Sequence, residues 1–289
     1  MKHLLKFAAL AACSLSGTLY AQKTDVSLFW RADSVQLREI VSEEAVQYNF
    51  VGHHGPAIEN PYMALRIYFN NSGAIDVYSK KKFQLELADC AWYPTEAEQA
   101  AGYGCDEYKV GSTVGLGGIN LWDGNRVQQL VATQGRIARV NRGKKESTAE
   151  MLAKGVAYKN GMVDILIRVR MDNKHRYAIV EAECTSGQEV QFVTGVNFHP
   201  DKTMEYGEGY AAVWGVHPPD VSQAPIQIGG GIRYNADDME SVTETADMIR
   251  LVSKPATRLK TWVISAGEKE KDLNNAAAFI AYVKKMKVK

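Results

Sequence analysis

Short runs in which apolar and polar residues alternate recur along almost the whole chain, and they constrain its fold more than any other feature. Alternation with a period of two is typical of β-strands that bury one face. We expect strands within residues 26–50 and at 64–69, 74–78, 83–87, 119–122, 127–133, 137–140, 163–171, 177–184, 190–198, 210–216 and 257–265. Turn signals separate them, among them Asp123-Gly124-Asn125, Asn160-Gly161, Pro218-Pro219 and Gly229-Gly230-Gly231. Strands at this spacing, without helical periodicity between them, predict a sandwich or barrel.

Two segments depart from the alternation and predict helices. Within residues 272–286, Leu273, Ala277, Ile280 and Val283 recur at helical spacing after a possible cap at Asp272. A second, short helix is expected at 95–101, inside an irregular insert. The predicted fold is therefore all-β, a large antiparallel β-super-sandwich with one C-terminal helix, and residues 22–289 are expected to form a single domain.

The first 21 residues predict a signal peptide. Lys2 and Lys6 precede a short apolar run, and Ala21 ends a small-residue cleavage site. The segment around Cys13 also resembles a lipobox, which would lipidate that cysteine, but cleavage after Ala21 is the preferred interpretation. We therefore expect an exported protein, periplasmic or extracellular. The apolar run is too short to span a bilayer.

Charge and cysteine content exclude several classes of protein. Cleavage after Ala21 leaves 32 Lys and Arg against 33 Asp and Glu, a balance that argues against nucleic-acid binding and against a polybasic membrane anchor. Three cysteines remain. Cys90 and Cys105 are close enough in sequence to form a disulfide, which the sequence leaves open, and Cys184 is expected to be a buried apolar residue. We expect a monomer without a cofactor.

Residues 64–78 predict a β-hairpin with one apolar face and one polar face. A three-residue loop that ends in a left-handed glycine would place Tyr68 opposite Asp76 and Arg66 opposite Tyr78. A slip by one residue would mix the two faces, so the pattern itself favours this register.

The stretch from residue 53 to 118 concentrates the side chains that could act on an acidic sugar. Arg66 or Lys109 could hold a uronate carboxylate. For β-elimination, a histidine would act as the base and Tyr68 as the acid. The candidate catalytic residues are His53, His54, Tyr68 and Lys109, and the candidate substrate-binding residues are Glu59, Arg66, Asp76, Asp106 and His199. Hydrolysis would instead use two of the carboxyl groups of Glu59, Asp76 and Asp106, and the sequence does not choose between the reactions.

Other motifs favour structural roles. The glycines between residues 111 and 118 lack the features of a P-loop or of a dinucleotide fingerprint, and a tight β connection is the favoured interpretation. His199 and His217 follow strand-like runs and could join a metal site or an acid–base site. No HExxH or CxxC spacing occurs, so no metal is expected.

Three segments resemble the signature of a secreted bacterial family, domain of unknown function 4861. Residues 55–81 (GPAIENPYMALRIYFNNSGAIDVYSKK) are similar to EGPAWEND-x-x-AFRIYF…-x-IDIFGK, and residues 102–122 (GYGCDEYKVGSTVGLGGINLW) are similar to GMDILKVGNSLGAGGIALW. TGVNFH, at residues 194–199, resembles TGI-x-NLH. The motif positions are Glu59, Asn60, Arg66, Tyr68, Asp76, Asp106, Lys109 and His199.

The resemblance implies a secreted protein of polysaccharide-utilisation systems, with a super-sandwich like that of galactose mutarotases and several polysaccharide lyases. Two positions depart from the family pattern: Pro61 replaces an aspartate, and residues 90–104 replace a loop that contains Tyr and His. If that histidine is catalytic in relatives, this chain is inactive or uses His53 or His54 instead.

The leading hypothesis is an exported carbohydrate-active protein that cleaves an acidic, uronate-containing polysaccharide or oligosaccharide, by β-elimination ahead of hydrolysis. One alternative is a non-catalytic glycan-binding protein that presents the same polar face. The other is a mutarotase-like sugar epimerase that uses a histidine and a carboxylate.

Overall fold

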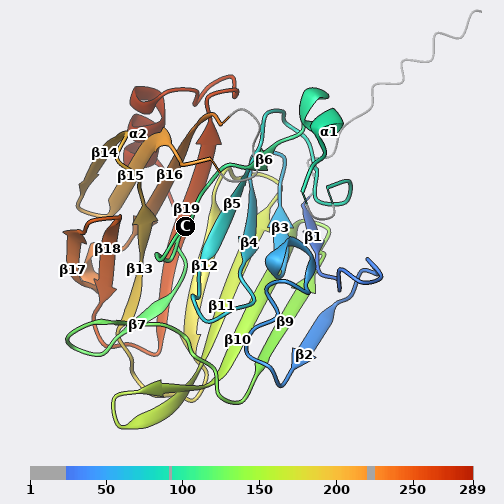
Figure 1. Cartoon of the computed structure of the whole chain (residues 1–289). Coiled ribbons are helices and arrows are strands. Elements are labelled where there is room, and N and C mark those ends of the chain that lie inside the picture. Colours follow the sequence, from blue (N-terminus) through green and yellow to red (C-terminus); the bar gives the residue numbers. More distant parts are fainter. Residues whose placement is uncertain (1–23, 91–92, 220–224, 289) are drawn as a thin grey trace, which may run out of the picture.

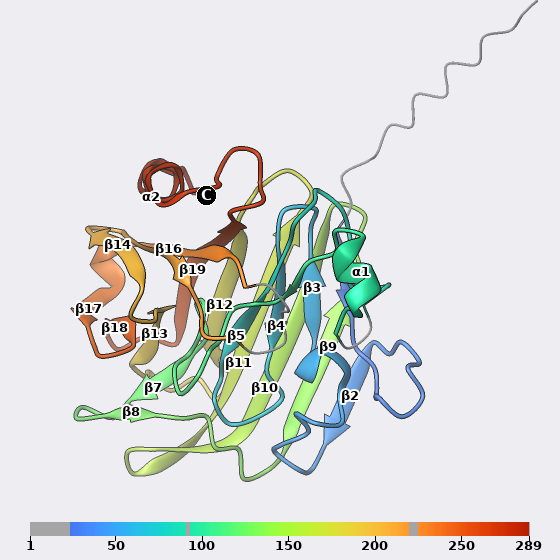
Figure 2. The same ribbon diagram turned by 45° about the horizontal axis from the view of Figure 1, so that its top comes forward.

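The computed structural model describes residues 24–90, 93–219 and 225–288. The strands form three sheets arranged in two layers, with one nine-stranded sheet behind two five-stranded sheets that lie side by side (Figure 1, Figure 2). Neighbouring strands within each sheet pair antiparallel, so the prediction of an all-β antiparallel sandwich is confirmed. The signal-peptide prediction, with Cys13, falls outside the described residues.

The nine-stranded sheet forms the back layer. Its order is β14 (Lys202–Gly207), β15 (Tyr210–Val216), β16 (Gln227–Tyr234), β19 (Arg258–Gly267), β12 (Ala178–Cys184), β11 (Gly161–Asp172), β10 (Glu146–Tyr158), β9 (Arg136–Asn141) and β2 (Glu39–Ser42). The sequence pattern missed β10 and β14. β10 nevertheless alternates between buried and more exposed residues along most of its length, as expected for a strand between two others.

The two smaller sheets form the front layer. The first sheet has the order β1 (Asp25–Ser27), β3 (Ala57–Glu59), β4 (Ala64–Ile67), β5 (Ile75–Ser79) and β6 (Cys105–Asp106). The second has the order β17 (Met239–Glu244), β18 (Met248–Ser253), β13 (Phe192–Asn197), β7 (Asn120–Trp122) and β8 (Val127–Gln128). β17 and β18 were also missed by the pattern.

The glycine-rich segment 111–118 joins the two front sheets. Gly115 forms a parallel bridge with Ile75 of β5, and Leu116 forms an antiparallel bridge with Val196 of β13. Gly115 has a φ of +68°, and a Cβ there would collide with the carbonyl oxygen of Ile75. Only glycine allows this close approach of two backbones, which accounts for the motif as a structural connection.

The apolar face of the predicted hairpin packs into the largest hydrophobic cluster, which draws residues from all three sheets. The division of the hairpin into an apolar and a polar face is as predicted, but the register is different. Arg66 pairs with Asp76, two residues from the predicted partner Tyr78. The amide of Tyr68 donates to the carbonyl of Ala74, so the loop is longer than three residues. A shift by two residues keeps every side chain on its predicted face.

The C-terminal helix α2 (Ala276–Lys285) covers the other face of the nine-stranded sheet at β15 and β16 (Figure 2). Its N-cap is Asn275 and not Asp272. The sequence pattern placed Ala277 on the buried face of the helix, but Ala277 is exposed and Phe279 is buried instead. The predicted turn at residues 229–231 is wrong, because these glycines lie within β16. A Cβ at Gly231 would lie 2.6 Å from Val283 Cγ2, so the lack of side chains lets the helix pack closely.

An insert between β5 and β6 folds over the outer face of the first front sheet. It contains the predicted short helix α1 (Glu96–Ala100), whose N-cap Thr95 forms a capping box with Glu98. The strand predicted at 83–87 is wrong, since these residues form bends and turns. Leu87 and Cys90 of the insert pack against Ala57, Ala64 and Tyr78 of the sheet. The polar face of the hairpin is therefore covered and not solvated.

Two single-turn 3₁₀ helices complete the described elements: Gly52–His54 before β3 and Ala236–Asp238 before β17. The cysteines at 90, 105 and 184 are free and buried, so Cys90 and Cys105 form no disulfide, and Cys184 is buried as predicted.

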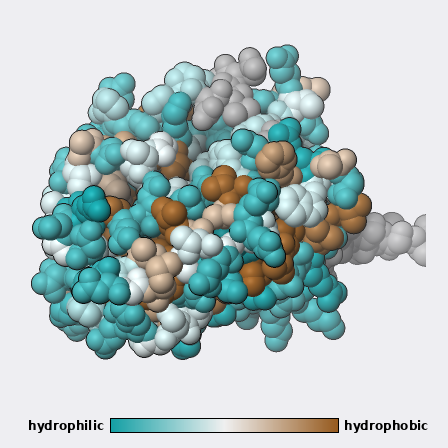
Figure 3. All heavy atoms as spheres, turned by 60° about the horizontal axis from the view of Figure 1, so that its bottom comes forward, coloured by the Kyte–Doolittle hydropathy of each residue, from teal (hydrophilic) through white to brown (hydrophobic). Residues whose placement is uncertain are grey.

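The surface at the turn ends of the strands carries scattered apolar side chains among hydrophilic ones (Figure 3). Within the described part of the chain, no helix is long and apolar enough to cross a membrane.

Candidate functional site

A charge cluster of Arg66, Asp76 and Asp106 lies on the outer face of the first front sheet. The three residues come from β4, β5 and β6, and alternation along these strands turns their side chains away from the core. Nη2 of Arg66 contacts the carboxylate of Asp76 and lies 2.6 Å from Oδ2 of Asp106. Arg66 and Asp76 are fully buried. The charges are therefore removed from water and compensate one another.

Burial governs the electrostatics of this cluster. It raises the pKa of Asp76 to about 7; the Arg66 cation opposes the shift, and Asp106 adds to it. For Arg66, burial works against the cation, but Asp106 and Asp76 outweigh it, so its pKa lies well above the usual value. Nε and Nη1 of Arg66 have no hydrogen-bond partner among the described residues. A buried donor without a partner is costly, and both donors are enclosed, since Arg66 is fully buried beneath the insert.

Tyr68 connects the charge cluster to the surface. Its hydroxyl donates to Oδ2 of Asp76 at 2.6 Å, and its side chain is partly exposed. Burial, followed by the nearby Asp76 carboxylate, raises the pKa of Tyr68 well above 10, so the phenol stays protonated at neutral pH. The predicted pair of Tyr68 and Asp76 thus occurs, although the backbone register that was expected to create it does not.

His54 lies beside this phenol, with the two ring centroids 6.0 Å apart. Its Nδ1 lies 2.9 Å from the carbonyl oxygen of Tyr48, which can only accept, so Nδ1 carries a proton. In the neutral ring, Nε2 is then the acceptor, and it receives a hydrogen bond from the hydroxyl of Tyr93 at 2.5 Å. The ring also stacks on Tyr48 at 3.9 Å. These contacts fix the tautomer of His54, with the lone pair of Nε2 engaged by the Tyr93 hydroxyl.

His53 lies in a different environment, although it is adjacent in sequence. Its ring is buried edge-on against Phe29, and burial, together with the charge of Arg66, lowers its pKa to about 3. His53 and His54 have φ values of 55° and 62°, in the left-handed region that non-glycine residues seldom adopt. This backbone conformation, and not strand alternation, separates the two rings. Of the two predicted bases, the structure favours His54.

A second group, the histidine pair of His199 and His217, lies beyond β6. The two rings are 4.6 Å apart, and Tyr108 lies 4.3 Å from His217. The carbonyl of Lys109 accepts from His199 Nε2 at 2.9 Å, whereas the amine of Lys109 forms no ion pair within the described ranges. Burial lowers the pKa of His217 to about 3, and His199 adds to this effect. Tyr108 and Lys109 lie two and three residues after Asp106, so one short segment links both groups.

Glu59, a predicted substrate-binding residue, makes a structural ion pair. Its carboxylate binds the buried amine of Lys80 and accepts backbone N–H groups from Glu86 at 2.9 Å and Leu87 at 2.8 Å. These contacts fix the start of the insert on the sheet. Glu59 lies on the same face as the charge cluster but makes no printed contact with it within the described chain.

The geometry separates the two predicted reactions. Hydrolysis needs two carboxyl groups across the scissile bond, about 5–9.5 Å apart. Asp76 and Asp106 instead share one nitrogen of Arg66, which leaves no room for a sugar between them. The arrangement is better suited to the proton transfer that β-elimination needs, because the phenol of Tyr68 is hydrogen-bonded to Asp76, whose pKa is raised to about 7.

Metal binding has no matching arrangement in the described residues. No group of three or more His, Cys, Asp or Glu is placed to hold a metal ion. His199 and His217 are close together, but in this part of the chain they lack a third such ligand.

Comparison with known families assigns the chain. The model of the family described as domain of unknown function (DUF4861) matches residues 20–289. The chain belongs to this family. The resemblance based on sequence motifs is thereby confirmed. In the structure, the residues on which the resemblance was based include the charge cluster, Tyr68, Glu59 and the Lys109–His199 contact. A search of curated proteins finds no match.

Several solved structures share a distant likeness of fold with this DUF4861 chain. A heparan sulfate lyase from Pedobacter heparinus is 14% identical, with 83% of this chain and 39% of the lyase covered and a TM-score of 0.38. A putative aldose 1-epimerase from Klebsiella pneumoniae is 8% identical, with 90% of this chain and 96% of the epimerase covered and a TM-score of 0.41. A 4-alpha-glucanotransferase from Thermococcus litoralis is 7% identical, with 79% of this chain and 41% of the transferase covered and a TM-score of 0.34. The chain thus spans about two fifths of the lyase, and no activity follows from these values.

Sequence reasoning missed two residues of the site, Tyr48 and Tyr93, which hold His54. His217 was named with His199 as a candidate for a metal or acid–base site, and the two rings lie 4.6 Å apart. Tyr93 belongs to the insert that replaces the usual family loop, and no local pattern connects it to His54.

Proposed function

We propose that this protein is an exported carbohydrate-active protein that acts on an acidic, uronate-containing polysaccharide or oligosaccharide by β-elimination. The observation that carries the proposal is the hydrogen bond of 2.6 Å between Tyr68, a partly exposed phenol, and Asp76, a buried carboxyl group. A phenol in this position can donate its proton to a leaving oxygen and regain one from the carboxyl group behind it.

In the proposed reaction, the Tyr93 hydroxyl gives up its hydrogen bond to His54 Nε2, and this nitrogen then removes the proton at C5 of the uronate. The electron pair forms the C4–C5 double bond, the C4–O bond breaks, and the leaving oxygen takes the proton of Tyr68. Asp76 is suited to reprotonate Tyr68, because a pKa of about 7 keeps a large fraction of it protonated near neutral pH. The partly exposed amine of Lys109 is the group available to neutralise the uronate carboxylate, whereas Arg66 is buried and holds Asp76 and Asp106.

A non-catalytic glycan-binding protein is the second candidate, and one observation favours it. The charge of Arg66 is already matched by two carboxylates, which weakens its attraction for a third. Such a protein would bind acidic glycans on the same face without turnover.

One assay separates these functions. The protein without residues 1–21 is incubated with pectic, ulvan-type and glycosaminoglycan substrates while unsaturated-uronate absorbance and reducing ends are followed. Absorbance growth supports β-elimination, reducing ends alone mean hydrolysis, and binding without either supports the second candidate. Faster anomer exchange by NMR, with no cleavage, would mean a mutarotase-like epimerase.

Variants of the acid then test the residue assignment. Tyr68→Phe retains the ring but loses the proton donor, so turnover is expected to fall by about 10²–10⁴-fold. Tyr206→Phe removes a phenol from β14, which is exposed and lies outside the site, and serves as the control. Equal rates for the two variants would remove Tyr68 from the mechanism.

A further inference from the structure

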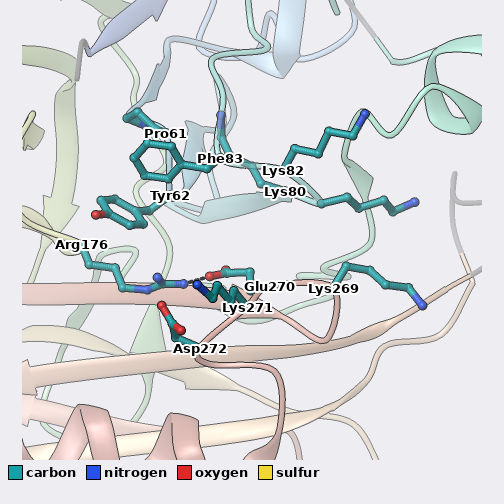
Figure 4. Close-up of a pocket in the computed structure, with 11 residues that line it drawn as sticks. Pro61, Tyr62, Lys80, Lys82, Phe83, Arg176, Lys269, Glu270, Lys271 and Asp272 are labelled. Atoms are coloured by element: carbon teal, nitrogen blue, oxygen red, sulfur yellow. Dashed lines mark ion pairs between the residues drawn. The ribbon is translucent and has the colours of Figure 1, made fainter. Parts of the chain in front are cut away.

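A cleft of about 410 Å³ opens between the end of β5 and the loop that follows β19 (Figure 4). Its lining includes six cationic residues, which come from three separate segments: Lys80, Lys81, Lys82, Arg176, Lys269 and Lys271. The acidic residues of the lining are Glu270 and Asp272. Six positive charges against two give the cleft a positive character, although the whole chain is nearly neutral.

The ion pairs of the cleft show which cations remain for a ligand. Lys80 and Lys81 are neutralised by Glu59 and Glu107, which reach them from the sheet. Arg176 pairs with Glu270, and Lys269 lies 3.6 Å from Glu268. Lys82 and Lys271 are exposed, and neither is paired with a carboxylate in the described chain; the Lys82 amine donates to the carbonyl of Ala101. These two amines lie in segments far apart in sequence and border one cleft.

One wall of the cleft is aromatic. Phe83 directly follows the three lysines and is 55% exposed, which is a large exposure for an apolar ring. It packs edge-to-face on Tyr62, with the two ring centroids 4.8 Å apart. The guanidinium of Arg176 lies 4.9 Å from the centroid of Tyr62 and pairs with Glu270 (Figure 4). Tyr62 thus lies between an aromatic ring and a cation, and the exposed ring of Phe83 forms an apolar surface beside the charged residues.

We propose that this cleft is a binding subsite for an anionic oligosaccharide, in which the C–H face of a sugar ring stacks on Phe83 and separate acidic substituents of the chain pair with Lys82 and with Lys271. The combination selects for this ligand class, because a free anion would not use the ring and a neutral sugar would not use the amines. The inference rests on the proposed function for the choice of an acidic glycan. It adds a subsite outside the charge cluster that holds the chain of the substrate.

Calorimetry with the protein lacking residues 1–21 tests the subsite. The ligands are tetragalacturonate, a chondroitin sulfate tetrasaccharide and maltotetraose, which represent a carboxylated, a sulfated and a neutral chain. Lys82→Ala combined with Lys271→Ala is expected to weaken binding of the acidic chain by about fivefold or more, and Phe83→Ala by about tenfold. The matched control is Lys144→Ala combined with Lys254→Ala, which removes the same charge from exposed positions outside the cleft and is expected to leave the dissociation constant unchanged.

The outcomes divide the two proposals. Binding of tetragalacturonate or of chondroitin sulfate that both cleft variants weaken supports the subsite, and the preferred chain identifies the acidic group as carboxylate or sulfate. Binding that neither variant affects, binding of maltotetraose with equal strength, or no binding of either acidic chain overturns it. If the wild type cleaves an acidic glycan and the cleft variants leave its KM unchanged, the subsite fails and the proposed function stands. If cleft-dependent binding occurs without cleavage, the subsite stands and β-elimination fails.

Discussion

The buried pair of Glu59 and Lys80 allows a quantitative test of whether a family motif residue is structural. Removing one member of a buried ion pair leaves an uncompensated charge and costs about 3–5 kcal/mol. Lys80 is 4% exposed and Glu59 is fully buried, so neither charge can be solvated without opening the fold. The loss would be a large part of the total stability of about 5–15 kcal/mol that is typical of such proteins.

The two single changes affect different contacts. Glu59→Gln loses the charge, but its amide oxygen can still accept the N–H groups of Glu86 and Leu87, so we expect a loss of about 3 kcal/mol, from the stranded Lys80 cation. Lys80→Met leaves Glu59 with these two N–H donors, which favour the charged carboxylate, and its loss is expected to be smaller, about 2 kcal/mol. The double variant replaces the ion pair by an amide and an apolar chain of similar length. Its loss should fall below the sum of the single losses by about 2 kcal/mol.

Urea unfolding of all four proteins at pH 7, followed by tryptophan fluorescence, completes the double-mutant cycle. If the two single losses add to within about 0.5 kcal/mol, the pair does not interact and the reasoning from burial is refuted. The same double variant tests function. If it folds and still turns over or binds an acidic glycan as the wild type does, Glu59 acts as a structural residue, whereas loss of both with a preserved fold would return it to the substrate site.

Three further measurements test other parts of the structure. Burial raises the pKa of Asp76 to about 7 in the folded state, so folding favours its protonated form, and the stability it contributes is lost as the pH rises from about 4 to 7. Asp76→Asn should therefore flatten the fall in the free energy of urea unfolding across this pH range. An unchanged slope would contradict the raised pKa. Gly231→Ala should cost about 1–3 kcal/mol in thermal unfolding, because its Cβ would lie 2.6 Å from Val283 Cγ2, whereas Gly161→Ala, with its nearest neighbour at 3.9 Å, should cost much less. In the protein without residues 1–21, all three thiols should react with a chromogenic disulfide only after unfolding, because they are free and buried; a single reactive thiol in urea would reveal a disulfide.

The class of fold was predictable because alternation and turn chemistry are local properties. The faces of the hairpin followed from a period of two, and they survived the error in register because that error was an even number of residues. Strand β10 was missed because alanine and glutamate recur in it, and these residues are depleted in strands elsewhere. The glycines of β16 were predicted to form a turn. They are needed instead for close packing of α2, which lies about fifty residues away in the chain, so no local pattern indicates this role.

The candidate site was predictable in composition but not in environment. Arg66, Tyr68 and Asp76 share a face as the pattern indicated, yet the same pattern is typical of solvated hairpins, and only the insert buries it. The different environments of His53 and His54 depend on two successive residues in the left-handed region, which a pattern of alternating strand residues does not predict.

The contacts of Glu59 connect these observations. Its carboxylate holds the N–H groups at the start of the insert, and the same insert supplies Tyr93, whose hydroxyl binds His54 Nε2. In this chain, Glu59 thus anchors the segment that supplies a partner for His54, as a structural residue that makes no contact with the charge cluster within the described residues.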